Sequence, residues 1–341
     1  MNGIAVVTGA SGHVGANLVR ALLAEGRPVR VLLRKDSRAV AGLPVEKVEG
    51  DVLDPASLLH VMRGASTVFH AAGRISIVGS EHGLVDRTNV QGVRNVIKAC
   101  KEAGVGRLVH FSSIHAFTSE PHDEPVAETR ALALGPKALP YDRSKALGQQ
   151  EILRAAAGGL DAVVLNPTAI IGPHDYKGSR MGRVLLGIAT HALPAVVDGG
   201  YNWVDARDVA LAALAAEKRG RSGECYLLPG RWVHIRDVSV FIQKLTGRKT
   251  PQWAAPLWLA RPASAAALAW GLALGREPLF TPAAIRALSG HRLVSGEKAA
   301  SELDYHPRPF EDTVYDTLEW FLREGAWKGE LPPRARVMHM D

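Results

Sequence analysis

Residues 4–26 read IAVVTGASGHVGANLVRALLAEG, and this stretch decides the fold. It begins with β-branched residues typical of a buried strand and ends with apolar residues at helical spacing. Between them, Gly9, Gly12 and Gly15 form a turn with almost no side chains. A phosphate can reach backbone N–H groups only where no Cβ blocks its approach, and a helix N-terminus adds a positive dipole end. The stretch therefore predicts a strand, a phosphate-binding turn and a helix.

The alternation of strand and helix continues along the chain up to Pro167. One helix is expected after Asp54, which is suited to cap it, with Pro55 at its first position. Strands that are rich in valine and leucine and alternate with helices indicate a buried parallel sheet. The expected strands span residues 4–10, 28–34, 44–52, 67–72, 107–113, 161–167 and 223–230.

These elements predict an α/β fold, in which a doubly wound parallel sheet is joined to a smaller, mostly helical domain. Residues 168–182 are expected to form a loop. The end of the chain holds two adjacent prolines and many charges, which is typical of a loose tail. The ranges that we assign are 1–167 and about 201–230 for the sheet domain, 168–200 and 231–325 for the smaller domain, and 326–341 for the tail.

Composition narrows the class of protein. Apolar residues make up 47% of the 341 residues, which is enough for a packed core. The net charge of +7 is spread along the chain without a long basic run, so we expect anionic small ligands and no nucleic acid. Cys100 and Cys225 are expected to be buried thiols, and no signal peptide is expected, as in a cytoplasmic protein. No close set of ligand residues has metal-binding spacing, so we expect no metal.

One apolar stretch leaves three interpretations open. Residues 256–275 read PLWLARPASAAALAWGLALG, which is about the length that a membrane-spanning helix needs. Arg261 and Pro262 interrupt the stretch, which favours instead a cover over an apolar pocket or a packing surface. Peripheral contact with a membrane surface is the third interpretation. Trp258 and Trp270 in this stretch favour an apolar substrate.

At residues 8–15, TGASGHVG resembles the TGxxGxxG motif of the extended short-chain dehydrogenase/reductase family, within the NAD-dependent epimerase/dehydratase superfamily. The resemblance continues in FHAAG at 69–73, NVQGVRNV at 89–96 and LNPTAIIGP at 165–173. It covers most of residues 3–325 and implies a Rossmann fold that binds NAD or NADP. The nearest groups are similar to dihydroflavonol reductases, 3β-hydroxysteroid dehydrogenases and hopanoid-associated epimerases, and a homodimer is common in the family.

The end of the second strand bears on the choice of cofactor. NAD enzymes usually have an acidic residue there, whereas this chain has Arg34 and Lys35. A guanidinium can bind a 2′-phosphate through two hydrogen bonds, so we expect NADP(H). If the next turn places Asp36 on the ribose, NAD(H) is the cofactor instead. The residues expected to bind the cofactor are Gly9, Ser11, Gly12, His13, Val14, Gly15, Arg34, Lys35, Asp51, Val52, Ala71, Ala72, Gly73, Tyr141, Lys145, Asn166, Pro167 and Thr168.

Tyr141 and Lys145 stand four residues apart in YDRSK, which places them on one helix face. A nearby ammonium lowers the pKa of a phenol, so the tyrosine can transfer a proton to or from a carbonyl oxygen. The resemblance adds Ser113, in preference to Ser112, to polarise that oxygen. It also adds Asn89 to support a proton relay or to orient the sheet. Ser113, Tyr141, Lys145 and Asn89 are therefore the candidate catalytic residues.

The substrate is expected to contact Ser113, His115, Tyr141 and His174. The first interpretation of the function is an NADP(H)-dependent reductase of an apolar ketone or aldehyde, or a dehydrogenase of a secondary alcohol. The second is an NAD-dependent nucleotide-sugar epimerase or dehydratase, against which Arg34 counts. The third is a cofactor-binding protein without turnover, which would have a broken Ser–Tyr–Lys set, and all three residues are present here.

Overall fold

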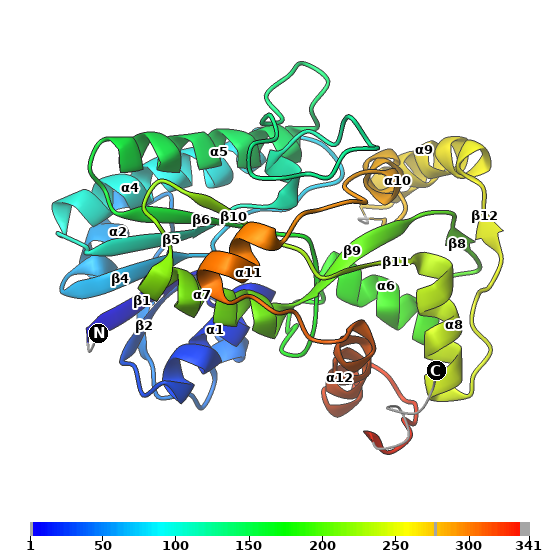
Figure 1. The fold of residues 1–341 in the computed structure, drawn as a ribbon. Helices are drawn as coiled ribbons and strands as arrows, with labels where there is room; N and C mark the ends of the chain where they lie inside the picture. Colours follow the sequence, from blue (N-terminus) through cyan, green and yellow to red (C-terminus); the bar gives the residue numbers. More distant parts are fainter. Residues whose placement is uncertain (1–2, 276–277, 335–341) are drawn as a thin grey trace.

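The computed structural model describes residues 3–275 and 278–334 (Figure 1). Its centre is the predicted parallel sheet, which has seven strands with β1 inside it. The chain runs from β1 outward to β3 and then crosses back to β4, so the direction of winding reverses beside β1. Ligand sites of such sheets form at this reversal, at the carboxyl ends of the strands. In spatial order the strands are β10 (Cys225–Leu228), β6 (Ala162–Pro167), β5 (Arg107–Phe111), β4 (Ala65–His70), β1 (Ile4–Thr8), β2 (Val29–Leu33) and β3 (Glu46–Glu49).

Helices cover both faces of this sheet (Figure 1). On one face α1 and α7 bury residues such as Leu18 and Val209 against the strands. On the other face α2, α4 and α5 bury residues such as Leu58 and Ile152. The helices around the sheet are α1 (His13–Ala24), α2 (Pro55–Met62), α3 (Leu84–Asp86), α4 (Gly92–Glu102), α5 (Pro140–Ala157), α7 (Ala206–Arg219) and α11 (Glu297–Leu303).

The smaller domain contains strands that the sequence analysis did not predict. The expected loop at 168–182 holds β7 and the start of α6, and β9 pairs with β7 and β11 instead of joining the large sheet. We therefore propose that the sheet domain resumes at Ala206, where α7 begins. The elements of the smaller domain are β7 (Ala169–Ile171), α6 (Arg180–Ala189), β8 (Val196–Val197), β9 (Gly200–Asp205), β11 (Arg231–His234), α8 (Ile235–Thr246), β12 (Ala254–Ala255), α9 (Leu257–Ala273), α10 (Pro282–Ser289) and α12 (Phe310–Arg323).

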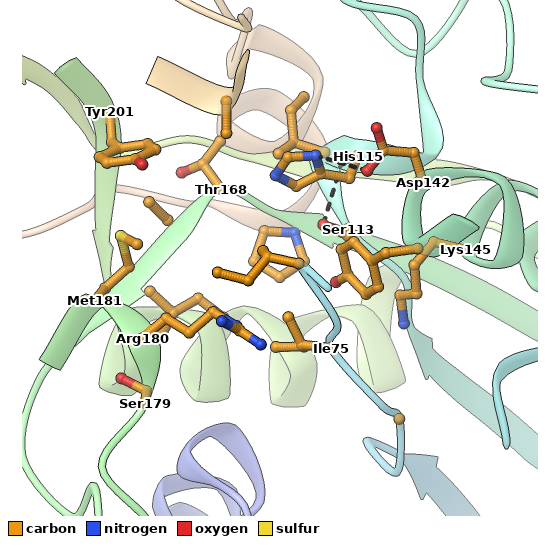
Figure 2. A pocket seen from close by; sticks show the side chains of 18 of the residues that line it. Ile75, Ser113, His115, Asp142, Lys145, Thr168, Ser179, Arg180, Met181 and Tyr201 are labelled. Carbon is orange, nitrogen blue, oxygen red and sulfur yellow. Dashed lines mark hydrogen bonds and ion pairs between the residues drawn. The ribbon is translucent and has the colours of Figure 1, made fainter. Parts of the chain in front are cut away.

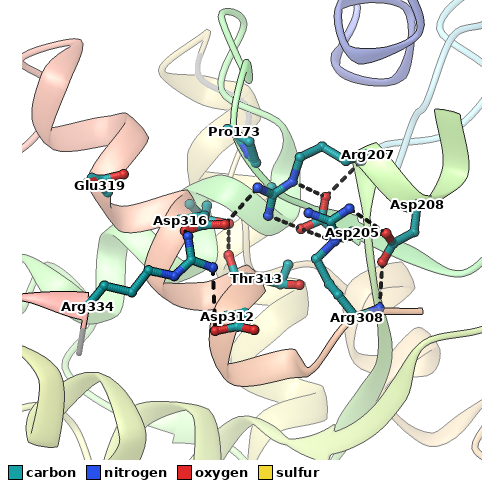
Figure 3. Close-up of polar contacts among 12 residues, drawn as sticks. Pro173, Asp205, Arg207, Asp208, Arg308, Asp312, Thr313, Asp316, Glu319 and Arg334 are labelled. Atoms are coloured by element: carbon teal, nitrogen blue, oxygen red, sulfur yellow. Dashed lines mark hydrogen bonds and ion pairs between the residues drawn. The ribbon is translucent and has the colours of Figure 1, made fainter. Parts of the chain in front are cut away.

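A network of ion pairs joins α7 to α12 (Figure 3). Arg207 lies 2.6 Å from Asp205 and 2.7 Å from Asp316 of α12, and the side chain of Asp205 is completely buried. Asp205 also caps α7 by accepting a hydrogen bond from the Arg207 amide. Arg308 forms a second pair with Asp208 at 2.6 Å. Because a buried carboxylate is costly without a partner, this network fixes α12 against the sheet domain.

The segment after Gly325 is packed where the structure describes it, although the sequence analysis expected a loose tail. Trp327 is only 3% exposed and belongs to the core of the smaller domain, and the Tyr315 hydroxyl donates to the Pro332 carbonyl oxygen. Residues 335–341 of the expected tail lie outside the described residues. Both cysteines are buried and free, as predicted. Among the described residues, no helix is long and apolar enough to cross a bilayer.

Candidate active site

Close backbone contacts shape the glycine turn between β1 and α1. Gly9 has a φ of +75°, and a Cβ at this position would lie 2.5 Å from the amide nitrogen of Ala72. A Cβ at Gly15 would lie 2.2 Å from the carbonyl oxygen of Gly9. Gly12 is the N-cap of α1 and lines a cavity. Glycine is thus required at 9 and 15 for close packing, whereas at 12 it leaves the helix N-terminus open to a ligand.

This cavity has a volume of about 370 Å³ and lies at the carboxyl ends of the strands (Figure 2). Its wall brings together the glycine turn, the ends of β4, β5 and β6, and the start of α5. Residues of the predicted cofactor set that line it are Gly12, His13, Val14, Gly15, Ala71, Gly73, Tyr141, Lys145, Pro167 and Thr168. Much of the remaining wall is apolar and includes Ile75, Ile77, Leu139, Met181, Val184 and Leu279.

Tyr141 and Lys145 lie one turn apart on α5, beside Ser113, and all three line the cavity. Burial raises the pKa of Tyr141 to about 12, and its hydrogen bond with Ser113 offsets only part of this effect. The Nζ atom of Lys145 donates to the Phe111 carbonyl oxygen at 2.8 Å, and burial lowers the Lys145 pKa to about 8. The Tyr141 pKa is therefore raised rather than lowered, with burial as the largest cause. At neutral pH the phenol keeps its proton.

Two buried amide side chains hold these residues in place from outside the cavity wall. Asn166 donates to the carbonyl oxygen of Ser113 at 2.9 Å. Asn89 accepts from the Arg74 amide and donates to the Arg74 carbonyl oxygen and to the Ser144 hydroxyl. The Ser144 hydroxyl in turn donates to a carbonyl oxygen in the first turn of α5. The side chains of Asn89 and Asn166 thus hold other groups of the protein in place, and neither is part of the cavity wall.

His115 lies on the cavity wall, where the sequence analysis placed it near the substrate. Its Nδ1 atom is 3.1 Å from a carboxylate oxygen of Asp142, and its ring centroid is 5.7 Å from that of Tyr141. His291 packs edge-on against the ring of His115 and also lines the cavity. The sequence analysis missed Asp142, although it directly follows Tyr141, and it missed His291, which comes from a distant segment after α10. The three polar side chains form a cluster beside Tyr141, and Figure 2 shows His115 next to Asp142.

His174, which the sequence analysis expected to contact the substrate, lies outside the cavity wall. Its ring packs against Trp320 of α12, with 4.7 Å between the ring centroids, and burial lowers its pKa to about 4. The loop after β7 turns toward α12 at this residue and returns to the cavity at Ser179 and Arg180. Arg180 is therefore a wall residue that the sequence analysis missed, because a loop has no periodicity to indicate its path.

The residues expected to bind the adenosine part of the cofactor lie apart from the cavity. Arg34 is exposed and its guanidinium is 3.8 Å from the carboxylate of Asp51. Val52 is buried in the core beside α2, and Lys35 is exposed. Asp36, the residue that would favour NAD, accepts two hydrogen bonds from the Arg38 guanidinium at 3.0 Å, which lowers the Asp36 pKa to about 2.

A lysine from the smaller domain joins this end of the site, and the sequence analysis missed it. The Nζ atom of Lys177 donates to the hydroxyl of Ser11 in the glycine turn at 2.8 Å. Arg34, Arg38 and Asp36 are all close enough to affect the Lys177 pKa, which burial lowers. The same loop is tied to α1, because His13 Nε2 lies 3.1 Å from the carbonyl oxygens of residues 172 and 173. Three cationic side chains thus gather beside the glycine turn.

Of the interpretations left open for residues 256–275, a cover over the pocket does not match the structure. Ala283, Ala284 and Ala287 of α10 form part of the cavity wall. No residue of α9 contributes to that wall. Trp258 is 75% exposed. The apolar stretch therefore needs a different explanation.

Comparison with known proteins places the chain in a family. A model of the NAD dependent epimerase/dehydratase family matches residues 5–228. The chain is 33% identical to sterol demethylase protein B of Methylococcus capsulatus (94% of this chain, 98% of that one) and 32% identical to a putative dihydroflavonol 4-reductase of Synechocystis (94% and 95%). The structure of a nucleoside-diphosphate-sugar epimerase from Pseudomonas aeruginosa is similar, with a TM-score of 0.78, 26% identity, and 95% and 99% of the two chains covered. The chain belongs to the NAD-dependent epimerase/dehydratase family and is an NAD(P)-dependent enzyme of the extended short-chain dehydrogenase/reductase type.

Proposed function

We propose that the chain is an NADP(H)-dependent oxidoreductase that reduces a ketone or aldehyde of an apolar small molecule, or oxidises the corresponding alcohol. The observation that carries this proposal is the meeting of Ser113, Tyr141 and Lys145 with the glycine turn on the wall of one mainly apolar cavity. A nucleotide sugar is polar over its whole surface, whereas much of this wall is made of apolar side chains such as Ile75 and Leu279. Relatives named for a sterol and for a dihydroflavonol are consistent with an apolar substrate.

In the proposed reaction each of the three residues has a separate part. A nicotinamide would supply or accept the hydride when bound, and the wall at Gly73, Pro167 and Thr168 would hold it. Tyr141 donates its proton to the carbonyl oxygen, because its raised pKa keeps it protonated at neutral pH. Ser113 is a hydrogen-bond partner of Tyr141 and polarises the same oxygen. Lys145, one turn away, stabilises the phenolate that remains after the proton has left.

The choice of NADP(H) rests on the cations beside the glycine turn. Arg34, Arg38 and Lys177 supply positive charge where a 2′-phosphate would lie, and Asp36 is already engaged by Arg38. A carboxylate held in this way does not accept a hydrogen bond from a ribose hydroxyl as readily as a free one.

The variant Lys177→Ala tests this choice of cofactor. The dissociation constants of NADPH and NADH are measured by fluorescence titration. We expect NADPH to bind about tenfold more weakly to the variant than to the wild type, with little change for NADH. An equal loss for both nucleotides would mean that Lys177 only supports the turn through Ser11.

The variant Tyr141→Phe tests the reaction. It keeps the ring in the cavity but removes the proton donor, so we expect NADPH oxidation with apolar ketones to fall by about 10²-fold to 10⁴-fold. Its affinity for NADPH should match that of the wild type. Unchanged turnover would refute the assignment of Tyr141.

A second measurement separates the reductase from the epimerase. The purified protein is denatured, and any released nucleotide is identified by its mass. Tightly held NAD in equal amount to the protein would favour an epimerase, which regenerates its cofactor in place. Released NADP(H), or an empty protein that then binds NADPH, supports the reductase.

A further inference from the structure

The buried residues of helix α9 are small, and most of its large side chains are exposed. Its buried residues are Ala260, Ser264 and Gly271. By contrast, Trp258 and Trp270 are 75% and 71% exposed. An ordinary surface helix has the opposite arrangement, because it buries its large apolar side chains against the core. The exposed face of α9 is therefore fitted to an apolar partner outside the chain.

The exposed side chains share one side of the helix. With about 100° between successive residues, the three buried residues form one narrow stripe. Trp258, Leu259, Trp270 and Leu272 all lie within about 80° of the opposite direction on the same geometry. Leu259 and Leu272 are 40% and 59% exposed. Figure 1 shows α9 at the outer edge of the molecule, beyond α10.

The segment around this face is positively charged. Between residues 250 and 296 the chain has four arginines and only one acidic residue, Glu277. Within the part of this segment that the structure describes, which excludes 276 and 277, no side chain is a carboxylate. Arg261 is exposed on α9 and Arg286 is exposed on α10. Tryptophans and leucines flanked by arginines fit the boundary between the headgroups and acyl chains of an anionic bilayer.

The same face lies close to the cavity. Helix α9 packs against α10, and α10 forms part of the cavity wall through Ala283, Ala284 and Ala287. One short helix therefore separates the apolar face from the interior of the site.

We propose that α9 binds the surface of an anionic lipid bilayer, with Trp258 and Trp270 inserted at the headgroup level and Arg261 beside the phosphates. Resting on the proposed function, we further infer that the cavity takes its apolar ketone from that bilayer. An apolar molecule is concentrated in lipid, and docking there spares it a passage through water.

The full chain is tested by sedimentation with vesicles of phosphatidylcholine, with and without phosphatidylglycerol. The test variant is Trp258→Ser combined with Trp270→Ser, and the control is Leu211→Ser, which replaces a 54% exposed leucine on α7. We expect the wild type and the control to bind vesicles that contain phosphatidylglycerol, and added salt to weaken binding. The double variant should bind at least about tenfold more weakly, with an unchanged circular dichroism spectrum.

Two outcomes would overturn the proposal. One is that the wild type remains in the supernatant with both kinds of vesicle. The other is that the wild type self-associates without binding lipid and the double variant is monomeric, in which case the face joins two copies of the chain.

A kinetic comparison separates this inference from the proposed function. The double variant should match the wild type on a water-dispersed ketone and be slower on the same ketone embedded in vesicles. Equal rates on the embedded ketone would refute delivery from the bilayer. If neither protein reduces any ketone, the proposed function fails, and vesicle binding is still decided by sedimentation.

Discussion

Replacing Lys145 by methionine should stabilise the folded protein at neutral pH while it abolishes turnover. Lys145 is 8% exposed, and burial lowers its pKa from 10.5 to about 8. That change corresponds to about 3 kcal/mol of unfavourable free energy for holding the charged form in the fold. The variant also loses the hydrogen bond to the Phe111 carbonyl oxygen, which costs about 1 kcal/mol. The net gain in the free energy of unfolding is therefore about 2 kcal/mol.

The difference in stability between Lys145→Met and the wild type should depend on pH. Below about pH 8 the lysine is charged in both the folded and the unfolded wild type, so the full cost of burial is present. Between about pH 8 and 10.5 the folded state releases the proton while the unfolded state keeps it, so the wild type gains stability relative to the variant. The advantage of Lys145→Met should thus be largest at neutral pH, vanish at about pH 9.5 and become a deficit of about 1 kcal/mol near pH 10.5, where only the lost hydrogen bond remains.

Urea denaturation of the protein without nucleotide, followed by circular dichroism, measures this difference. Lys244→Met, at an exposed position on α8, is the matched control and should show no such pH dependence. The reasoning is refuted if Lys145→Met is less stable than the wild type at neutral pH. It is also refuted if the difference between the two proteins does not shrink as the pH rises.

Two further variants test other parts of the structure. Arg207→Met removes the cation shared by Asp205 and Asp316, so the free energy of unfolding should fall by about 3 kcal/mol in guanidinium denaturation; a loss well below 1 kcal/mol would contradict the role given to this network. Asp142→Asn removes the carboxylate beside His115, so the KM of the ketone should rise several-fold while the NADPH dissociation constant is unchanged; a loss of NADPH affinity would instead point to a structural role.

The parts of the site whose positions in the structure match the sequence analysis are those with a local pattern. The strand–turn–helix around Gly12 follows from glycine spacing and apolar periodicity. The shared helix face of Tyr141 and Lys145 follows from their four-residue spacing, and both line the cavity.

The parts that were missed come from segments without periodicity. Lys177 lies in the irregular loop between β7 and α6, and Arg180 is the first residue of α6. His291 lies in the irregular segment that follows α10. Their positions are set by packing between distant segments, which no local pattern reports. His174 lies away from the cavity for the same reason, because its ring packs against Trp320. β7 has only three residues, too few to show an alternation.

The loop between β7 and α6 has a consequence for the order in which ligands bind. Lys177 in this loop touches the glycine turn, and three residues later Arg180 lines the substrate cavity. A nucleotide that engages Lys177 thereby fixes the segment that completes the wall around the second ligand. We expect a compulsory-order kinetic scheme, in which the nucleotide enters first and leaves last. In steady-state measurements the oxidised nucleotide should then compete with NADPH, and the alcohol product should not.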